Sequence, residues 1–149
     1  MHSYIVDRLC GLGWTFETMN LMAPAVTCEL FERTVVPRLK KNAGEGRVKR
    51  LNEFHLTDTQ EQADPTCKPI LYYTRSLLYL VSESFEGGQR TPILGMDKYW
   101  NERIAALKLK NVQAWTAPGP QSASSTHGGF DDDKPTREEI GRLIRAAGA

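Results

Sequence analysis

The sequence predicts an α/β protein with a mostly parallel sheet flanked by helices, and two observations carry that prediction. Stretches typical of strands alternate along the chain with stretches typical of helices, which is the pattern of parallel sheets joined by helical crossovers. The 149 residues, 40% hydrophobic and 25% charged, are enough to bury the core of one globular domain. No internal repeat and no clear boundary divides the chain, so residues 1–149 are expected to form a single domain.

The first elements can be placed from apolar spacing and from capping residues. Apolar residues recurring on one face predict a short helix over residues 3–12, and a buried strand is expected over residues 15–25. Thr27 suits the N-cap of the helix that follows, because its hydroxyl can accept from an unpaired backbone N–H. We expect Pro37 to interrupt that helix, since proline lacks the N–H that a helix interior uses.

The second strand is expected over residues 48–57, where apolar and polar residues alternate. In this register Phe54 and Leu56 share one face, and His55 faces outward on the other. Residues 57–66 are polar and are expected to form a loop at the carboxyl end of the strand.

The second half of the chain repeats the pattern. Apolar residues every four positions predict a helix over residues 70–86, and residues 111–118 are the third strand candidate. The last element is an amphipathic helix over residues 136–147, for which Thr136 and Glu139 have the spacing of a capping box.

Charge and cysteine content exclude several classes of protein. The formal net charge is +1 and no basic stripe is present, so nucleic acid is not an expected partner. No apolar run approaches the roughly 20 residues of a membrane span, and the amino-terminal stretch lacks the features of a signal peptide. Cys10, Cys28 and Cys67 are odd in number and widely spaced, which indicates reduced thiols in a cytoplasmic protein rather than a disulfide framework or a zinc site.

Two loops bring titratable residues to the carboxyl end of the expected sheet, where functional loops of parallel sheets gather. The loop after the second strand carries Asp58, with Glu61 and Asp64 close by, and the loop after the third strand carries His127. An aspartate and a histidine from neighbouring strand ends can form the acid and base of a catalytic triad.

Simpler interpretations exist for each of these residues. A histidine in a glycine-rich loop is often an ordinary surface residue, although the glycines that follow His127 could let its ring project into a cleft. Asp58 stands between two threonines, which is ordinary turn chemistry. Residues 131–133, three aspartates, fit the start of the last helix better than a metal site, and no metal is expected.

Several segments, taken in order, resemble the carboxyl-terminal half of α/β-hydrolases. They are LMAPAVT, FHLTDTQEQADPT, TRSLLYLVSESFEG, TPILGM and STHGGFDDD. The chain looks closest to a group of uncharacterised bacterial and phage-type hydrolases, and the resemblance covers almost its whole length. The most specific parts are HLTDTQEQADPT with RSLLYLVSESFE, and HGGFDDD.

The resemblance implies a serine hydrolase that cleaves an ester or related acyl bond without a metal or organic cofactor. His127 would be the catalytic base and Asp58 its acidic partner, with Asp64 as the alternative acid. The G-x-S-x-G turn that presents the family's serine is absent. Ser3 stands in the corresponding place, but Met1 and Ile5 occupy the two glycine positions.

The chain is therefore expected to be a hydrolase domain that lacks the amino-terminal strands and is truncated at the nucleophile. Ser3, or a serine outside this chain, would attack a small ester-type substrate. An alternative is a non-catalytic remnant or interaction module that associates with another chain through an exposed sheet edge. A thiol enzyme that uses Cys67 or Cys28 is the remaining alternative.

Overall fold

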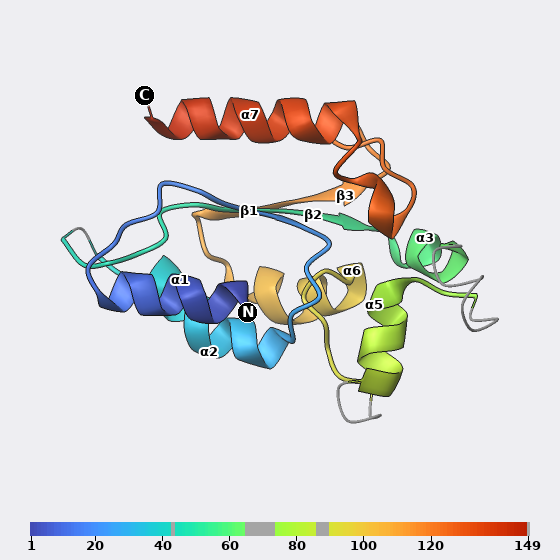
Figure 1. Cartoon of the computed structure of the whole chain (residues 1–149), viewed down its shortest axis with the longest axis horizontal. Helices are drawn as coiled ribbons and strands as arrows, with labels where there is room; N and C mark the ends of the chain where they lie inside the picture. Colours follow the sequence, from blue (N-terminus) through green and yellow to red (C-terminus); the bar gives the residue numbers. More distant parts are fainter. Residues whose placement is uncertain (43, 65–73, 86–89, 149) are drawn as a thin grey trace.

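The computed structural model describes residues 1–42, 44–64, 74–85 and 90–148 (Figure 1). Helices and strands alternate along these ranges, and η1 and η2 are π-helical whereas η3 and η4 are 3-10 turns. The elements are α1 (His2–Gly11), β1 (Met19–Met22), α2 (Cys28–Leu39), β2 (Leu51–Leu56), α3 (Asp58–Ala63), α5 (Leu77–Leu80), η1 (Val81–Phe85), α6 (Asp97–Tyr99), η2 (Trp100–Ile104), η3 (Ala105–Leu107), β3 (Val112–Ala117), η4 (His127–Gly129) and α7 (Lys134–Gly148).

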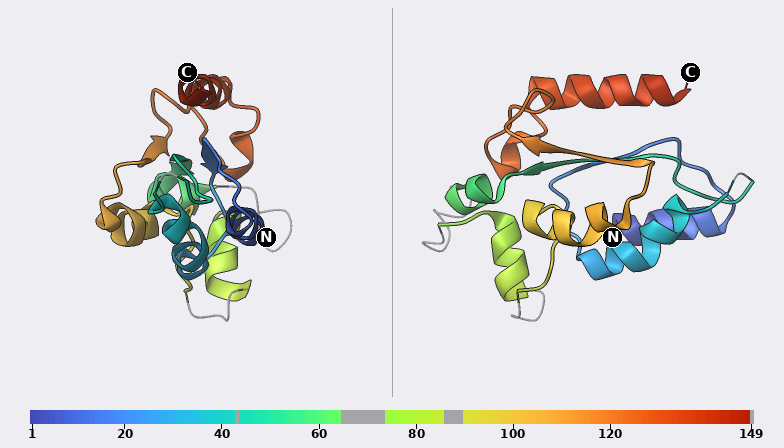
Figure 2. Two further views of the ribbon diagram at one scale, coloured as in Figure 1. Left: turned by 90° about the vertical axis from the view of Figure 1, so that its left-hand side faces the viewer. Right: turned by 180° about the vertical axis from the view of Figure 1, so that it is seen from behind.

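In the described ranges the strands form a three-stranded parallel sheet in the order β1-β2-β3. Met19 of β1 is paired with Leu51 of β2, which in turn is paired with Val112 of β3. Figures 1 and 2 show α7 over one face of the sheet, and α1, α2 and α6 beneath the other. The predicted α/β class, with a parallel sheet flanked by helices, is confirmed.

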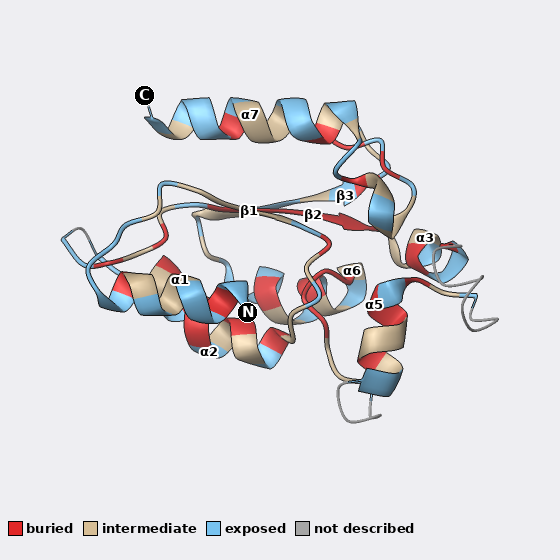
Figure 3. Ribbon diagram, in the orientation of Figure 1, coloured by how far each residue is buried: buried red, intermediate tan, exposed pale blue. Residues whose placement is uncertain are grey.

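The core lies on both faces of the sheet, as the buried segments of Figure 3 show. Leu51 packs with α1, α2 and η2 on one side, whereas Phe54 packs with Leu143 of α7 in a second cluster. Phe54 also stacks on Trp115 of β3, with ring centroids 4.9 Å apart. Every residue of β2 is buried, because the central strand of a parallel sheet is covered from both sides.

This burial corrects the expectation for His55. Phe54 and Leu56 do alternate with His55, but the face of His55 is not outward: the residue is only 1% exposed. The prediction treated β2 as half-exposed, which suits antiparallel sheets better than parallel ones. Helices α6 and η2 cover the His55 face, where its ring lies 5.9 Å from that of Trp100.

Two helix boundaries also differ from the predictions. Thr27 caps α2 as expected, accepting from the Leu30 N–H at 3.2 Å, but the helix continues through Pro37 to Leu39. Pro37 removes the hydrogen bond that its own N–H would donate, but only two helical residues follow it, so the disruption is confined to the last turn. Residues 57–66, expected to be a loop, contain the short helix α3, capped by Thr57.

The last helix begins earlier than predicted, and its cap is a different residue. Asp133 accepts from the Thr136 N–H at 2.9 Å, so the aspartate, rather than Thr136, closes the first turn of α7. Glu139 does not reach back to form a capping box and instead pairs with Arg142. The expectation that residues 131–133 serve the start of this helix is thus confirmed for Asp133.

A membrane-spanning helix would have to be long and apolar, and none of the helices in the described ranges meets that requirement.

Candidate functional site

The loops that follow β2 and β3 meet at the carboxyl edge of the sheet, where these strands end. Asp64 stands at the end of α3, directly after β2, and His127 opens the turn η4 after β3. The carboxylate of Asp64 accepts a hydrogen bond from the main-chain N–H of His127. The structure therefore brings the expected base together with Asp64, the alternative acid.

Burial and charge act on His127 in opposite directions. Burial lowers the pKa of His127, and the nearby Asp64 carboxylate opposes that change by favouring the imidazolium. The imidazole Nδ1 is buried and has no hydrogen-bond partner, because Asp64 contacts the main chain rather than the ring. His127 is therefore mainly neutral at pH 7, and a small rearrangement of Asp64 could give the buried Nδ1 a partner.

The glycines after His127 have a different purpose from the one predicted. In the described residues, neither has the positive φ that would demand glycine. A Cβ on Gly129 would lie 2.8 Å from Ser124 Oγ and 2.8 Å from Thr126 Oγ1, whereas Gly128 faces open space. Gly129 is needed for the close packing of the loop, not for a sharp turn.

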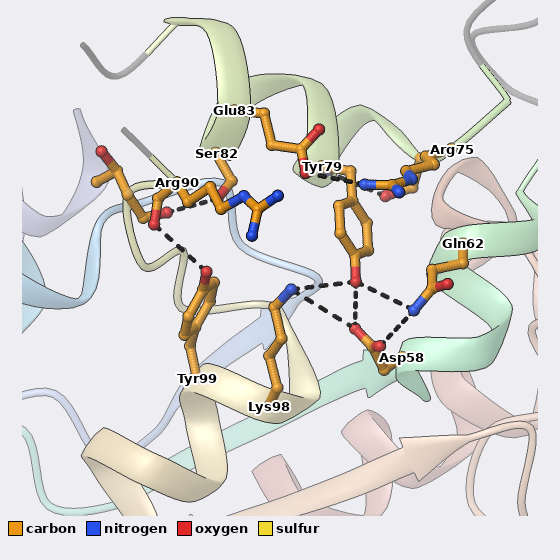
Figure 4. Close-up of polar contacts among 11 residues, drawn as sticks. Asp58, Gln62, Arg75, Tyr79, Ser82, Glu83, Arg90, Lys98 and Tyr99 are labelled. Carbon is orange, nitrogen blue, oxygen red and sulfur yellow. Dashed lines mark hydrogen bonds and ion pairs between the residues drawn. The ribbon is translucent and has the colours of Figure 1, made fainter. Parts of the chain in front are cut away.

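Asp58 lies at the other end of α3 and has its own partners (Figure 4). Its carboxylate accepts from the Tyr79 hydroxyl at 2.6 Å and from the Gln62 side-chain amide at 2.6 Å. Lys98 Nζ adds an ion pair at 3.9 Å. These contacts hold Asp58 toward α5 and α6, and no hydrogen bond joins it to His127.

Glu61 lies between the two aspartates on the same helix and is fully buried. Burial raises the pKa of Glu61 to about 7, the Ser76 side chain partly opposes the rise, and the charges of Asp64 and Asp58 add to it. Neither carboxylate oxygen has a well-formed hydrogen bond. Glu61 is thus a carboxyl group that exchanges its proton near neutral pH.

Ser3 is in the first turn of α1 and only 4% exposed. It lines a cavity of about 390 Å³ together with residues at the end of β1 and the start of α2. His127 does not line that cavity, and no hydrogen bond connects the two side chains. The structure thus leaves Ser3 apart from the Asp64–His127 pair.

The cysteines do not form a comparable site in the described residues. Cys10 and Cys28 are buried free thiols, and burial raises the pKa of Cys28 to about 12, which disfavours the reactive thiolate. Cys67 lies outside the described residues. No group of three histidine, cysteine, aspartate or glutamate side chains in the described ranges has metal-binding geometry.

The sequence interpretation missed a second buried set of titratable groups on β2. His55 Nδ1 lies 3.5 Å from Glu53 Oε1, and its Nε2 lies 3.4 Å from Asp97 Oδ1. Burial raises the pKa of Glu53. Burial also lowers the pKa of His55, and the nearby Asp97 opposes this second change. The available signal was the position of both residues in a parallel strand, where either face is buried.

Comparison of the chain with family models, with curated protein sequences and with solved structures gave no match.

Proposed function

We propose that the chain is a hydrolase of esters or related acyl bonds, of the α/β-hydrolase type, with His127 as general base and Asp64 as its acidic partner. One observation carries the proposal: Asp64 binds the main chain of His127 across the carboxyl edge of a parallel sheet. Asp64 takes the role first expected of Asp58, because the Asp58 carboxylate is occupied by Tyr79 and Gln62.

The electrostatics of His127 suit the role of a base. Burial keeps the pKa of the imidazole below its ordinary value, so the ring is neutral at pH 7 and can accept a proton. The reaction passes through an acyl-serine ester, which water cleaves with His127 again as the base. In the first half of the reaction, a serine hydroxyl attacks the acyl carbon while His127 accepts its proton, and the imidazolium then returns that proton to the departing alcohol. The negative charge of Asp64 stabilises the imidazolium between the two steps.

The nucleophile in this proposal is Ser3 or a serine supplied by a second chain. Ser3 has a position that supports the role, since it begins a helix beside the end of β1 and lines a cavity of about 390 Å³. Cavities of that size hold small molecules. Attack by Ser3 requires the amino-terminal turn to approach His127, because no contact links them.

Labelling with a fluorophosphonate tests the proposal, because such probes react with an activated serine. The purified chain is treated with the probe, and the labelled peptide is identified by mass spectrometry. We expect label on Ser3, lost in His127→Ala and in Asp64→Asn and retained in Asp58→Asn. The Asp58 variant is the matched control, as it removes one carboxylate from the same helix.

Other labelling patterns would show which part of the proposal, the acidic partner or the serine nucleophile, is wrong. Loss of label in Asp58→Asn but not in Asp64→Asn would return the acidic role to Asp58. A folded chain that gives no label at either low or high protein concentration would contradict hydrolysis by a serine of this protein, whether within one chain or between two copies.

A second candidate function, association through the sheet edge, is favoured by the position of β1. β1 is one of the two edge strands of the described sheet, the other being β3, and its residues are partly exposed. An open edge offers unpaired backbone groups to another strand. Met22, 41% exposed at the end of β1, gives the test: Met22→Lys is expected to weaken any self-association measured by sedimentation equilibrium. Sedimentation of the original chain as a monomer at all concentrations would contradict this candidate.

A further inference from the structure

A pocket of about 260 Å³ lies between α3, the α5–η1 helix and α6, apart from Ser3 and His127. We call it the cationic pocket, and Figure 4 shows the side chains around it. Its lining includes three cations, two tyrosines and a glutamate: Arg75, Arg90, Lys98, Tyr79, Tyr99 and Glu83. Three cations therefore face one cavity in which Glu83 is the single carboxylate among the described lining residues.

Two of these cations converge on one aromatic ring. The Arg75 guanidinium lies 5.0 Å from the centre of the Tyr79 ring, and Lys98 Nζ lies 4.4 Å from the same centre. Lys98 also donates to the Tyr79 hydroxyl at 3.1 Å. Glu83 forms an ion pair with Arg75 at 2.8 Å and offsets its charge. Asp58 is 3.9 Å from Lys98, and its carboxylate already accepts a hydrogen bond from the Tyr79 hydroxyl. Positive charge in the pocket is only partly compensated.

Arg90 is the cation with no partner of its own. Its guanidinium makes no hydrogen bond or ion pair with the described residues, and Figure 4 shows it extended toward Tyr79. Its backbone has φ of 54°, a left-handed conformation that costs energy for any residue except glycine.

Neighbouring hydrogen bonds hold Arg90 in this conformation. The Thr91 N–H donates to the Ser82 carbonyl at 2.9 Å, and the Ser82 hydroxyl donates back to the Thr91 carbonyl at 2.7 Å. The Tyr99 hydroxyl donates to the Arg90 carbonyl at 3.3 Å. The backbone of Arg90 and Thr91 is therefore held by hydrogen bonds, while the Arg90 side chain makes none to the described residues. This is the arrangement of a preorganised ligand-binding group.

We propose that the cationic pocket binds an oxyanion group, a carboxylate or a phosphate, through Arg90 and Lys98, with Arg75 adding positive charge. A guanidinium binds such groups with two parallel N–H···O bonds, and an ammonium adds a compact charge. Carboxylate and phosphate share this chemistry. The site does not depend on the hydrolase proposal, since binding requires neither His127 nor Ser3.

Titration of the full chain with inorganic phosphate and, separately, with acetate tests this proposal. Amide shifts are followed by ¹H–¹⁵N NMR at constant ionic strength. We expect saturable shifts at residues around Arg90 and Lys98. In Arg90→Gln and Lys98→Gln the dissociation constants should be about tenfold larger. Arg8→Gln is the matched control, because it removes one exposed positive charge on α1 and should leave the dissociation constants unchanged.

The two anions distinguish the source of the oxyanion. Tighter binding of phosphate indicates a phosphoryl group, and acetate binding of at least equal strength indicates a carboxylate. Lys98→Gln also removes a hydrogen bond to Tyr79, so circular dichroism is used to verify its fold. If Lys98→Gln is unfolded, the dissociation constants of Arg90→Gln alone test the proposal. Absence of saturable shifts with both anions, or equal weakening in Arg8→Gln, overturns the proposal.

Discussion

Two aspartates stand at opposite ends of one short helix, α3, and the surroundings give them different chemistry. Asp64 is 1% exposed and binds the main chain of His127, whereas the Asp58 side chain is 35% exposed and binds Tyr79 beside the cationic pocket. Both residues are aspartates of the same short segment, so the difference comes mainly from the elements packed against each end. Asp64 joins two loops of the sheet edge, and Asp58 organises a partly solvated cluster of side chains.

The largest expected effect concerns Glu61, the buried carboxyl group between the two aspartates. Its pKa of about 7, raised by burial from 4.5, means that the folded state keeps a proton that the unfolded state loses between these pH values. The free energy of unfolding therefore falls as pH rises through this window, by ~3 kcal/mol in total. Glu61→Gln should remove that part of the decrease in the free energy of unfolding. Urea unfolding measured from pH 4.5 to 8 gives the comparison.

The control for this prediction is Glu29→Gln, which changes an exposed glutamate of α2. A Glu61→Gln chain whose stability falls with pH as steeply as the original chain would contradict a buried, protonated Glu61.

The next effect compares the two aspartates directly. Asp64→Ala removes a buried charged acceptor from the His127 N–H and should lower the free energy of unfolding by ~2 kcal/mol. Asp58→Ala removes a partly exposed carboxylate, and its cost should stay below about 1 kcal/mol because water can solvate the released partners. Urea unfolding at pH 7 gives both values. Equal costs would show that burial does not separate the two ends of α3.

A smaller effect is expected at the Tyr79 hydroxyl, which connects Asp58, Lys98 and Gln62. Tyr79→Phe keeps the buried ring but loses this connection, and we expect a loss of ~1 kcal/mol in urea unfolding. Tyr99→Phe is the matched control, since within the described residues its hydroxyl makes one hydrogen bond, of 3.3 Å, to the Arg90 carbonyl. A cost for Tyr99→Phe as large as that for Tyr79→Phe would contradict a special role for the Asp58 cluster.

The smallest effect is electrostatic and is observed at His127. Burial lowers the pKa of His127, and the Asp64 charge opposes this, so Asp64→Asn should lower the pKa further. Asp58→Asn should leave it unchanged. NMR titration of the imidazole nitrogens measures the pKa in each variant. A rise in Asp64→Asn, or an equal change in both variants, would mean that Asp64 does not act on the ring.

Strands and caps were the features most accessible from the sequence. Apolar alternation located β2 to within a few residues, the strand candidate at residues 111–118 contained β3, and the hydroxyl of Thr27 identified the start of α2. The continuation of α2 through Pro37 was missed, because its tolerance depends on how close the proline is to the helix end. The burial of His55 was missed because it requires knowing that helices cover both faces of β2.

The candidate site divides in the same way. The sequence pointed to the loops after β2 and β3, since strand order predicts where parallel strands end. It could not choose between Asp58 and Asp64, because both stand in one loop and the choice depends on partners far along the chain. The cationic pocket gave no sequence signal, as Arg75, Arg90 and Lys98 lie in different segments.

By itself, the sequence determined the α/β class, the order of strands and helices, and the loops that carry titratable residues. These follow from local spacing, in which apolar periodicity and capping groups act within a few residues. Tertiary structure alone decided that Asp64 contacts His127, that Ser3 stands apart from both, and that three cations share one pocket. Burial and charge depend on distances between remote segments, and only the packing of the folded chain sets those distances.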